Sequence, residues 1–262
     1  WSSTLGLRES FMIDAGSKLL PSLGAERKWI FSKSLLVSHA KIAQGFRYPT
    51  LNDRFWLPGG NPSLNPEQSA STEIGFELRY PKFNTQVNVY QTWAQDWILW
   101  LPQSGNIWRP ENIQKVAISG IDYALGYHYF LNETKLESEV VLNYQRSINK
   151  SAYPSQAAYG NQLPYVPYFT AIWSNKIHIK KWTIALDQSY TSQRYTTLDQ
   201  SNTYAVAPYF LLDIAIDHPP ILGSVTTQIS LKANNIFNSY YENIQNRAMP
   251  GINFQLQIIT KL

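Results

Sequence analysis

The sequence predicts an all-β protein, specifically a transmembrane antiparallel up-and-down β-barrel. Three observations lead to this prediction. Apolar and polar residues alternate along runs of about ten to fifteen residues, which is typical of strands with one apolar and one polar face. The links between these runs are alternately long and short. Aromatic residues make up 14% of the chain and charged residues only 15%, well under the usual quarter for charged residues.

The alternation is clear at residues 70–80. Ile74, Phe76 and Leu78 would lie on one face of a strand. Glu73 and Glu77 would lie on the other face. We expect no helix and twelve strands, at residues 1–10, 17–26, 32–46, 70–80, 82–94, 116–130, 135–147, 165–179, 181–193, 209–217, 224–234 and 252–262.

The connections alternate in length from the third strand to the end. The short links are 81–82, 131–134, 180–181 and 218–223, and the long links are 47–69, 97–112, 148–163, 194–207 and 235–251. Outer-membrane barrels have this arrangement, with short periplasmic turns and long extracellular loops. Aromatic residues near strand ends fit the girdles at the two bilayer interfaces: Tyr80, Trp93, Trp97, Tyr129, Trp182 and Tyr209.

A soluble β-sandwich is the alternative, because its strands also alternate. The expected strands exceed the common length of about five or six residues. Their polar faces carry many Asn, Gln, Ser and Thr residues and few Lys residues, as a wet lumen would. We therefore favour the membrane barrel, whose sheet must close because lipid offers no partner to backbone groups. No stretch approaches 18 consecutive apolar residues, so we expect no transmembrane helix.

The longest break between strands lies at residues 45–69. It contains four prolines and three glycines, which exclude a helix or a central strand. Four aromatic residues, Phe46, Tyr48, Phe55 and Trp56, argue against disorder. We expect one long, ordered loop, and loops of this length are usually functional.

The sequence offers no catalytic or metal-binding constellation. Cysteine is absent, and the four histidines fall on different strands or turns without ligand spacing. Asp213 and Asp217 share a strand face, where a solvated lumenal pair is the simpler interpretation. The net charge of +4 is scattered, so nucleic acid is not an expected partner. We expect no enzyme activity, no cofactor and no metal.

Three motifs, spread over five short ranges, together resemble the TonB-dependent outer-membrane receptors. Residues 45–52 (GFRYPTLN) and 60–67 (GNPSLNPE) resemble that family's "GFRAPSL" and "GNPxLxPE" stretches. Residues 234–241 (NNIFNSYY) and 250–254 (PGINF) resemble its "NLFNxxY…PGR" ending. Residues 106–122 resemble its "N…GVE" strand. The matches occur in the family's order over most of the chain.

The resemblance implies a 22-stranded barrel around an N-terminal plug. Residues 1–262 would form the C-terminal portion, about 12 strands. The plug, the segment that contacts TonB and the signal peptide would precede this portion. The last strand must run toward the periplasm, so strand parity places the 47–69 loop outside the cell. The last strand also resembles an outer-membrane assembly signal, although it ends in Leu262 where family members commonly have Phe.

The resemblance also implies a function and partners. A receptor in the bacterial outer membrane would bind a large, scarce nutrient at its extracellular loops and import it with energy transmitted by TonB. Its partners would be outer-membrane lipid, the TonB complex and the small-molecule ligand, and we expect a monomer. Layout and loop size most resemble the vitamin B12 (cobalamin) transporters. A ferric-siderophore receptor is the alternative within the family, and a barrel enzyme or adhesin without transport is the alternative outside it.

Aromatic and polar groups on the long loops are the candidate ligand contacts, because aromatic faces suit a macrocycle or chelate with a polar rim. For each one, loop packing or a girdle position is the simpler interpretation. The candidates are Arg54, Phe55, Trp56, Trp97, Trp100, Trp108, Tyr153, Tyr159, Tyr195, Tyr204, Tyr240 and Tyr241.

Overall fold

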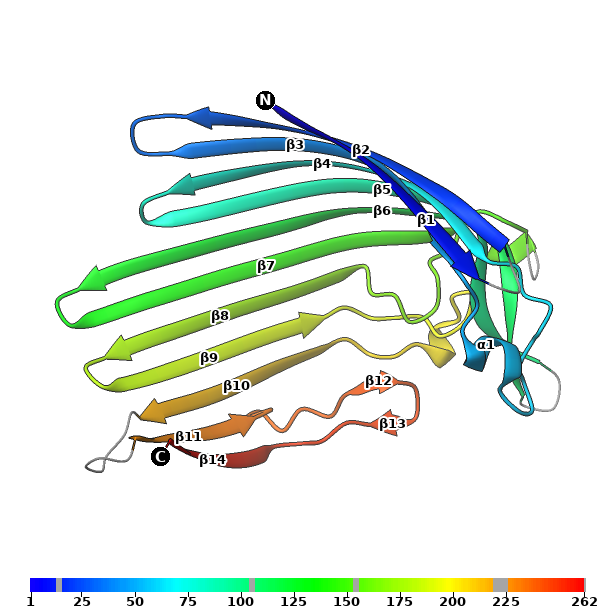
Figure 1. Cartoon of the computed structure of the whole chain (residues 1–262). Helices are drawn as coiled ribbons and strands as arrows, with labels where there is room; N and C mark the ends of the chain where they lie inside the picture. The colour runs from blue at the N-terminus through cyan, green and yellow to red at the C-terminus, as the bar shows by residue number, and fades with distance from the viewer. Residues whose placement is uncertain (13–15, 104–106, 153–155, 219–225, 262) are drawn as a thin grey trace.

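The structure is a curved antiparallel sheet of twelve strands (Figure 1). It is a computed structural model that describes residues 1–12, 16–103, 107–152, 156–218 and 226–261. The strands are β1 (Ser2–Met12), β2 (Gly16–Ile30), β3 (Leu35–Arg47), β4 (Glu67–Tyr80), β5 (Phe83–Pro102), β6 (Trp108–Leu131), β7 (Thr134–Asn149), β8 (Phe169–Ile179), β9 (Trp182–Thr191), β10 (Tyr209–His218), β11 (Thr226–Asn234) and β14 (Asn253–Lys261).

Each strand pairs with its neighbour in the chain. The order runs from β1 to β11 and then to β14. The twelve expected strands are therefore all present, and the all-β antiparallel fold is confirmed. The sheet stays open within the described residues, with β1 and β14 at its two edges. Leu262, the last residue of the twelfth expected strand, lies outside the described residues.

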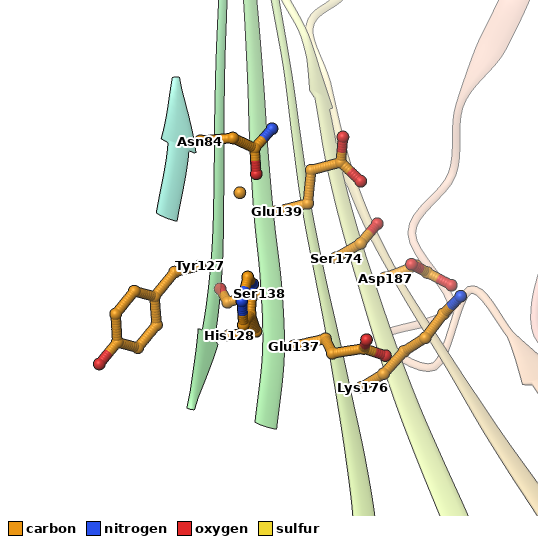
Figure 2. Close-up of a pocket in the computed structure, with 10 residues that line it drawn as sticks. Asn84, Tyr127, His128, Glu137, Ser138, Glu139, Ser174, Lys176 and Asp187 are labelled. Atoms are coloured by element: carbon orange, nitrogen blue, oxygen red, sulfur yellow. The ribbon is translucent and has the colours of Figure 1, made fainter. Parts of the chain in front are cut away.

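The two faces of the sheet differ as the alternation predicts. One face carries a polar hollow on β5 to β9, into which Glu139 and Lys176 point (Figure 2). Tyr127 points the other way in the same view. Large apolar side chains on that opposite face remain exposed, for example Ile74 and Val89. In a membrane barrel this apolar face contacts lipid and the polar face lines the lumen.

The two rims of the sheet also differ. Among the described links, those at residues 31–34, 81–82, 132–133 and 180–181 are short and lie together at one rim, at the left of Figure 1. Asn132 and Lys180 have positive φ values of 52° and 53°, as tight hairpin turns require. The short link expected at 218–223 lies largely outside the described residues. The long loops gather at the opposite rim, with α1 (Leu51–Phe55) and the hairpin of β12 (Glu242–Ile244) and β13 (Arg247–Ala248).

The long-loop rim contains the differences from prediction. The expected loop at 97–112 is wrong, because β5 and β6 continue to Pro102 and Trp108. The expectation of no helix is also wrong, because α1 interrupts the 47–69 loop. Two 3-10 turns, Gln156–Ala158 and Asn202–Tyr204, lie in other long links. No helix among the described residues is long and apolar enough to span a bilayer.

A small hydrophobic core orders this rim. Its buried side chains come from β5 and β6 and from the loops after β7 and β9, namely Ala94, Leu101, Ile113, Val116, Ala158, Leu163 and Leu198. When loops pack against strands through apolar side chains, the buried area offsets the entropy lost on ordering them. The long loops are therefore a folded surface.

Because one face of the sheet is assigned to lipid and the other to the lumen, the two faces should differ in how well they tolerate a charged side chain. We expect Val89→Arg, on the apolar face of β5, to destabilise the intact receptor in phospholipid vesicles by about 2–4 kcal/mol. Gln86→Arg, on the polar face of the same strand, serves as the matched control and should cost much less. Unfolding by guanidinium chloride measures the free energy of unfolding of each variant. Equal losses for the two variants would contradict the assignment.

Candidate functional site

An ion cluster closes the base of the loop between β3 and β4. Arg47 and Glu67 face each other in the last pair of the β3–β4 ladder. The Arg47 guanidinium makes two hydrogen bonds to the Glu67 carboxylate, one of 2.6 Å from Nε. Arg47 Nη1 also lies 3.7 Å from Asp53 Oδ2. Asp53 and Glu67 are only 6% and 7% exposed, so this cation neutralises two buried carboxylates.

Both carboxylates also hold the neighbouring strand β5. Glu67 Oε1 accepts a 2.8 Å hydrogen bond from the backbone N–H of Ile98. Asp53 Oδ1 accepts one of 3.0 Å from the indole Nε1 of Trp100. Thr50 and Asp53 form a capping box at the start of α1, each side chain accepting from the other's backbone N–H. These contacts fix α1 against the extended part of β5.

The environment of Asp53 perturbs its pKa. Burial raises the pKa of this carboxyl, because a charged form loses hydration. The hydrogen bonds from Thr50 and Trp100 and the charge of Arg47 outweigh burial and leave the pKa below its usual range. Asp53 is therefore held as a carboxylate that helps to order the loop.

The cluster supports an exposed apolar surface. Leu51, Phe55, Trp56 and Leu57 are all more than half exposed, and Leu57 reaches 87%. The Arg54 guanidinium lies 4.9 Å from the Phe55 ring centroid. Monomers rarely leave such apolar groups exposed together without a binding role. We call these four apolar residues and Arg54 the α1 surface.

Two glycines allow the loop to fold this tightly. A Cβ atom on Gly59 would overlap the backbone oxygen of Trp108. A Cβ on Gly60 would lie 2.6 Å from the backbone nitrogen of Trp56. Neither backbone can move away easily, so a larger residue at either position would displace the loop. The close approach of Gly59 to Trp108 places the α1 surface beside β6.

The loops after β7 and β9 form a second folded region. Gln162 and Asn149 are fully buried. Gln162 Oε1 accepts a 2.8 Å hydrogen bond from the Ser147 N–H, and Asn149 Nδ2 donates to the Ala158 carbonyl at 3.1 Å. Polar side chains buried with partners are typical of ordered loops. Tyr159 and Tyr204 are exposed on this region.

A third aromatic group lies at the loop between β11 and β14. The Tyr209 and Tyr241 rings lie 4.8 Å apart, and the Arg194 guanidinium lies 5.2 Å from the Tyr209 ring. Arg194 also donates a 2.9 Å hydrogen bond to the Glu242 carbonyl. Tyr240 is strongly exposed beside them.

The structure sorts the candidate ligand contacts by exposure. Phe55, Trp56, Trp108, Tyr159, Tyr204 and Tyr240 are exposed. Arg54, Trp97, Trp100, Tyr195 and Tyr241 are partly buried. Tyr153 lies outside the described residues. The exposed candidates lie at one rim but on several different segments, and no described contact joins them into a single pocket.

The placement of three tryptophans in a loop was wrong. Trp97, Trp100 and Trp108 lie in the extended strands β5 and β6. Trp97 packs against the rim core, and Trp100 donates its indole N–H to Asp53. The extended ends of β5 and β6 pair with each other, and this pairing fixes the positions of the three side chains. Trp100 supports the α1 surface through its hydrogen bond to Asp53.

Sequence reasoning missed the polar hollow on the inner wall. It has a volume of about 530 Å³ and is lined by polar groups including Asn84, Glu137, Glu139, Lys176 and Asp187 (Figure 2). Near it, His178 Nε2 lies 3.0 Å from Glu137 Oε2. The alternation along each strand predicts that these residues lie on the polar face. It does not predict that those of five strands line one hollow. Among the described residues, no group of three or more His, Asp or Glu side chains could hold a metal ion.

The fold and rim chemistry define a class of protein. An antiparallel sheet with an apolar outer face, short turns at one rim and long packed loops at the other is typical of outer-membrane β-barrels. The sequence matches the family profile described as "TonB dependent receptor-like, beta-barrel" over residues 1–238, so the chain belongs to this family. The predicted family and its outer-membrane location are confirmed. Members of the family are receptors and transporters rather than enzymes.

Two curated relatives are vitamin B12 transporters named BtuB. The one from Photobacterium profundum is 26% identical over 232 residues, covering 84% of this chain and 35% of the relative. The one from Vibrio vulnificus is 34% identical over 101 residues, covering 38% of this chain and 16% of the relative. The matched region is therefore about a third or less of these relatives.

Solved structures of the family share the fold. The copper transporter OprC gives a TM-score of 0.72 at 16% identity, covering 94% of this chain and 40% of that one. The ferric yersiniabactin uptake receptor FyuA from Yersinia pestis gives 0.67 at 17% identity, covering 94% and 38%. At these identities the likeness concerns the fold alone.

The ion cluster makes a prediction about loop order. Arg47→Gln leaves two buried carboxylates without their cation, which costs about 1–3 kcal/mol for an unsatisfied buried group. We expect faster hydrogen exchange at the Arg54 and Trp56 amides, which donate to the carbonyls of Thr50 and Asn52. Arg79→Gln removes an exposed ion pair with Glu77 and should leave these amides unchanged. Unchanged exchange in Arg47→Gln would contradict the role of the cluster.

The lowered pKa of Asp53 predicts a pH dependence. The pKa of Asp53 is lower in the folded protein than in the unfolded chain. The carboxylate therefore stabilises α1 fully above about pH 4, and this stabilisation is lost as the pH falls through the folded pKa. Exchange protection at Trp56, corrected for intrinsic rates, should hold from pH 7 to about 5 and decline below 4. Asp53→Asn should remove this dependence. If exchange protection at Trp56 declined in the same way in Asp53→Asn, the pH dependence would belong to another group.

Proposed function

We propose that this chain is part of an outer-membrane receptor that binds cobalamin at its extracellular loops and imports it with energy transmitted by TonB. One observation carries the choice of ligand. Two curated relatives that match the sequence are named vitamin B12 transporters, and one of them aligns with 84% of the chain.

The long-loop rim has chemistry that suits such a ligand. Phe55 and Trp56 offer exposed aromatic faces, and Arg54 lies beside them. A macrocycle with an apolar face and a polar rim needs both kinds of contact. The cluster of Arg47, Asp53 and Glu67 holds this surface in one conformation, which lowers the entropy cost of binding. Tyr159, Tyr204 and Tyr240 are further candidate contacts from the other loops.

A ferric-siderophore receptor is the second candidate. Several structural neighbours are receptors for ferric chelates, including FyuA and the ferric enterobactin receptor PfeA from Pseudomonas aeruginosa. Their identities to this chain are 17% and 16%, so they support this candidate only through the shared fold.

We expect the TonB contact in a segment of the full-length receptor N-terminal to this barrel portion.

Binding of cyanocobalamin to the full-length receptor in outer-membrane vesicles tests the proposal. We expect saturable binding, weakened about tenfold by Trp56→Ala, since about 1.4 kcal/mol corresponds to tenfold in affinity. Trp93→Ala, an exposed tryptophan on the apolar face of β5, is the control and should bind as the parent does. No saturable binding of cyanocobalamin, together with uptake of ferric chelates, would reject the cobalamin assignment.

A further inference from the structure

Cations at the short-turn rim have different partners on the two faces of the sheet. On the polar face, Lys28 Nζ lies 3.3 Å from Glu26, and Arg79 Nη2 donates a 2.9 Å hydrogen bond to Glu77. Lys135 forms an ion pair with Glu137 on the same face. Each of these lumenal cations is therefore neutralised by a carboxylate of the chain itself.

Arg27 lies on the opposite, apolar face of β2. Arg27 is paired with Ser38 and Lys28 with Val37, so the two adjacent side chains point to opposite sides. The Arg27 guanidinium contacts two indoles, with its carbon 3.4 Å from the Trp29 ring centroid and 4.7 Å from that of Trp1. Its neighbours in the structure are thus aromatic rings.

Lys82 has a similar environment at the turn between β4 and β5. Its Nζ lies 5.7 Å from the ring centroid of Tyr129. Tyr129 is two residues along β6 from Tyr127, so both rings lie on the apolar face. Tyr80 and Phe83 stack beside the turn with centroids 5.3 Å apart. The ammonium group of Lys82 therefore lies on the lipid-facing side.

Among the described residues, the apolar side of the short-turn rim carries no acidic side chain that could pair with these cations. The register places no Asp or Glu of the described strands on the apolar face in the half of the sheet near the short turns. Three of the four described turns carry exposed lysines, Lys33, Lys82, Lys180 and Lys181, against the single acid Glu133. Aromatic rings attract a cation only weakly compared with an anion.

We propose that Arg27 and Lys82 bind the phosphates of anionic phospholipids in the periplasmic leaflet of the outer membrane. The apolar face is continuous with these cations and already contacts acyl chains. Long basic side chains extend toward the headgroup level, where aromatic residues also concentrate. On the polar face, carboxylates of the protein supply the negative charge that pairs with each cation. On the apolar face, an anionic headgroup supplies it instead. The short-turn rim would thereby select lipid by charge.

Native mass spectrometry of the purified full-length receptor tests this inference. The receptor is incubated with an equimolar mixture of phosphatidylglycerol and phosphatidylethanolamine, and bound lipids are counted. We expect the parent to prefer phosphatidylglycerol. Arg27→Gln and Lys82→Gln should each weaken phosphatidylglycerol binding about fivefold, the effect of one basic residue near an anionic surface. Added salt should reduce the preference.

Lys28→Gln is the matched control, because it removes the same charge one residue away on the lumenal side. It should bind phosphatidylglycerol as the parent does. Equal binding of the two lipids by the parent overturns the proposal, even where a variant fails to fold. So does parent-like binding by both Arg27→Gln and Lys82→Gln, or an equal loss in Lys28→Gln. The heat-dependent gel mobility of each variant reports whether its barrel has folded.

Discussion

Backbone hydrogen bonding in lipid governs this structure. An N–H or C=O group exposed to hydrocarbon costs several kcal/mol, so a strand within the membrane must be paired along its whole length. The β5–β6 ladder shows the result, since it keeps one register from Phe83 and Tyr127 to Pro102 and Trp108. Helical turns and most residues with positive φ are confined to the rims. By the same rule, the edges of β1 and β14 need backbone partners within a membrane.

The same constraint explains which parts of the fold could be predicted. Strands between a wet lumen and lipid must alternate, so their sequence shows the period of two. The extensions of β5 and β6 do not alternate, because Ile98, Leu101 and Ile113 are all buried in the protein at the rim. Where both faces of a strand are covered, the alternation disappears. The short α1 had only a local signal, the spacing of Thr50 and Asp53 in a capping box.

The candidate site was predictable in composition but not in arrangement. The aromatic residues of the long links could be assigned to one rim from the sequence, and the structure places the described ones there. Sequence alone gave no means to separate Trp56, which is exposed, from Trp100, whose indole N–H is bound by Asp53 from 47 positions earlier. The pairing of Arg47 with Glu67 depends on where β3 ends and β4 begins, to the residue. Strand boundaries inferred from sequence are uncertain by more than that.

Charge placement connects the two rims. At the long-loop rim Arg47 is neutralised by Glu67 and Asp53, so the charge there serves to fix a loop whose apolar groups remain exposed. At the short-turn rim the alternation of β2 divides two adjacent cations, and only Lys28 receives a carboxylate. A carboxylate beside Arg27 would sit on the face that contacts lipid, where an ionised acid is costly. A lipid phosphate avoids that cost, because it is already part of the membrane surface. The apolar face can therefore carry cations without acids, and this links the charge pattern of the rim to the membrane around it.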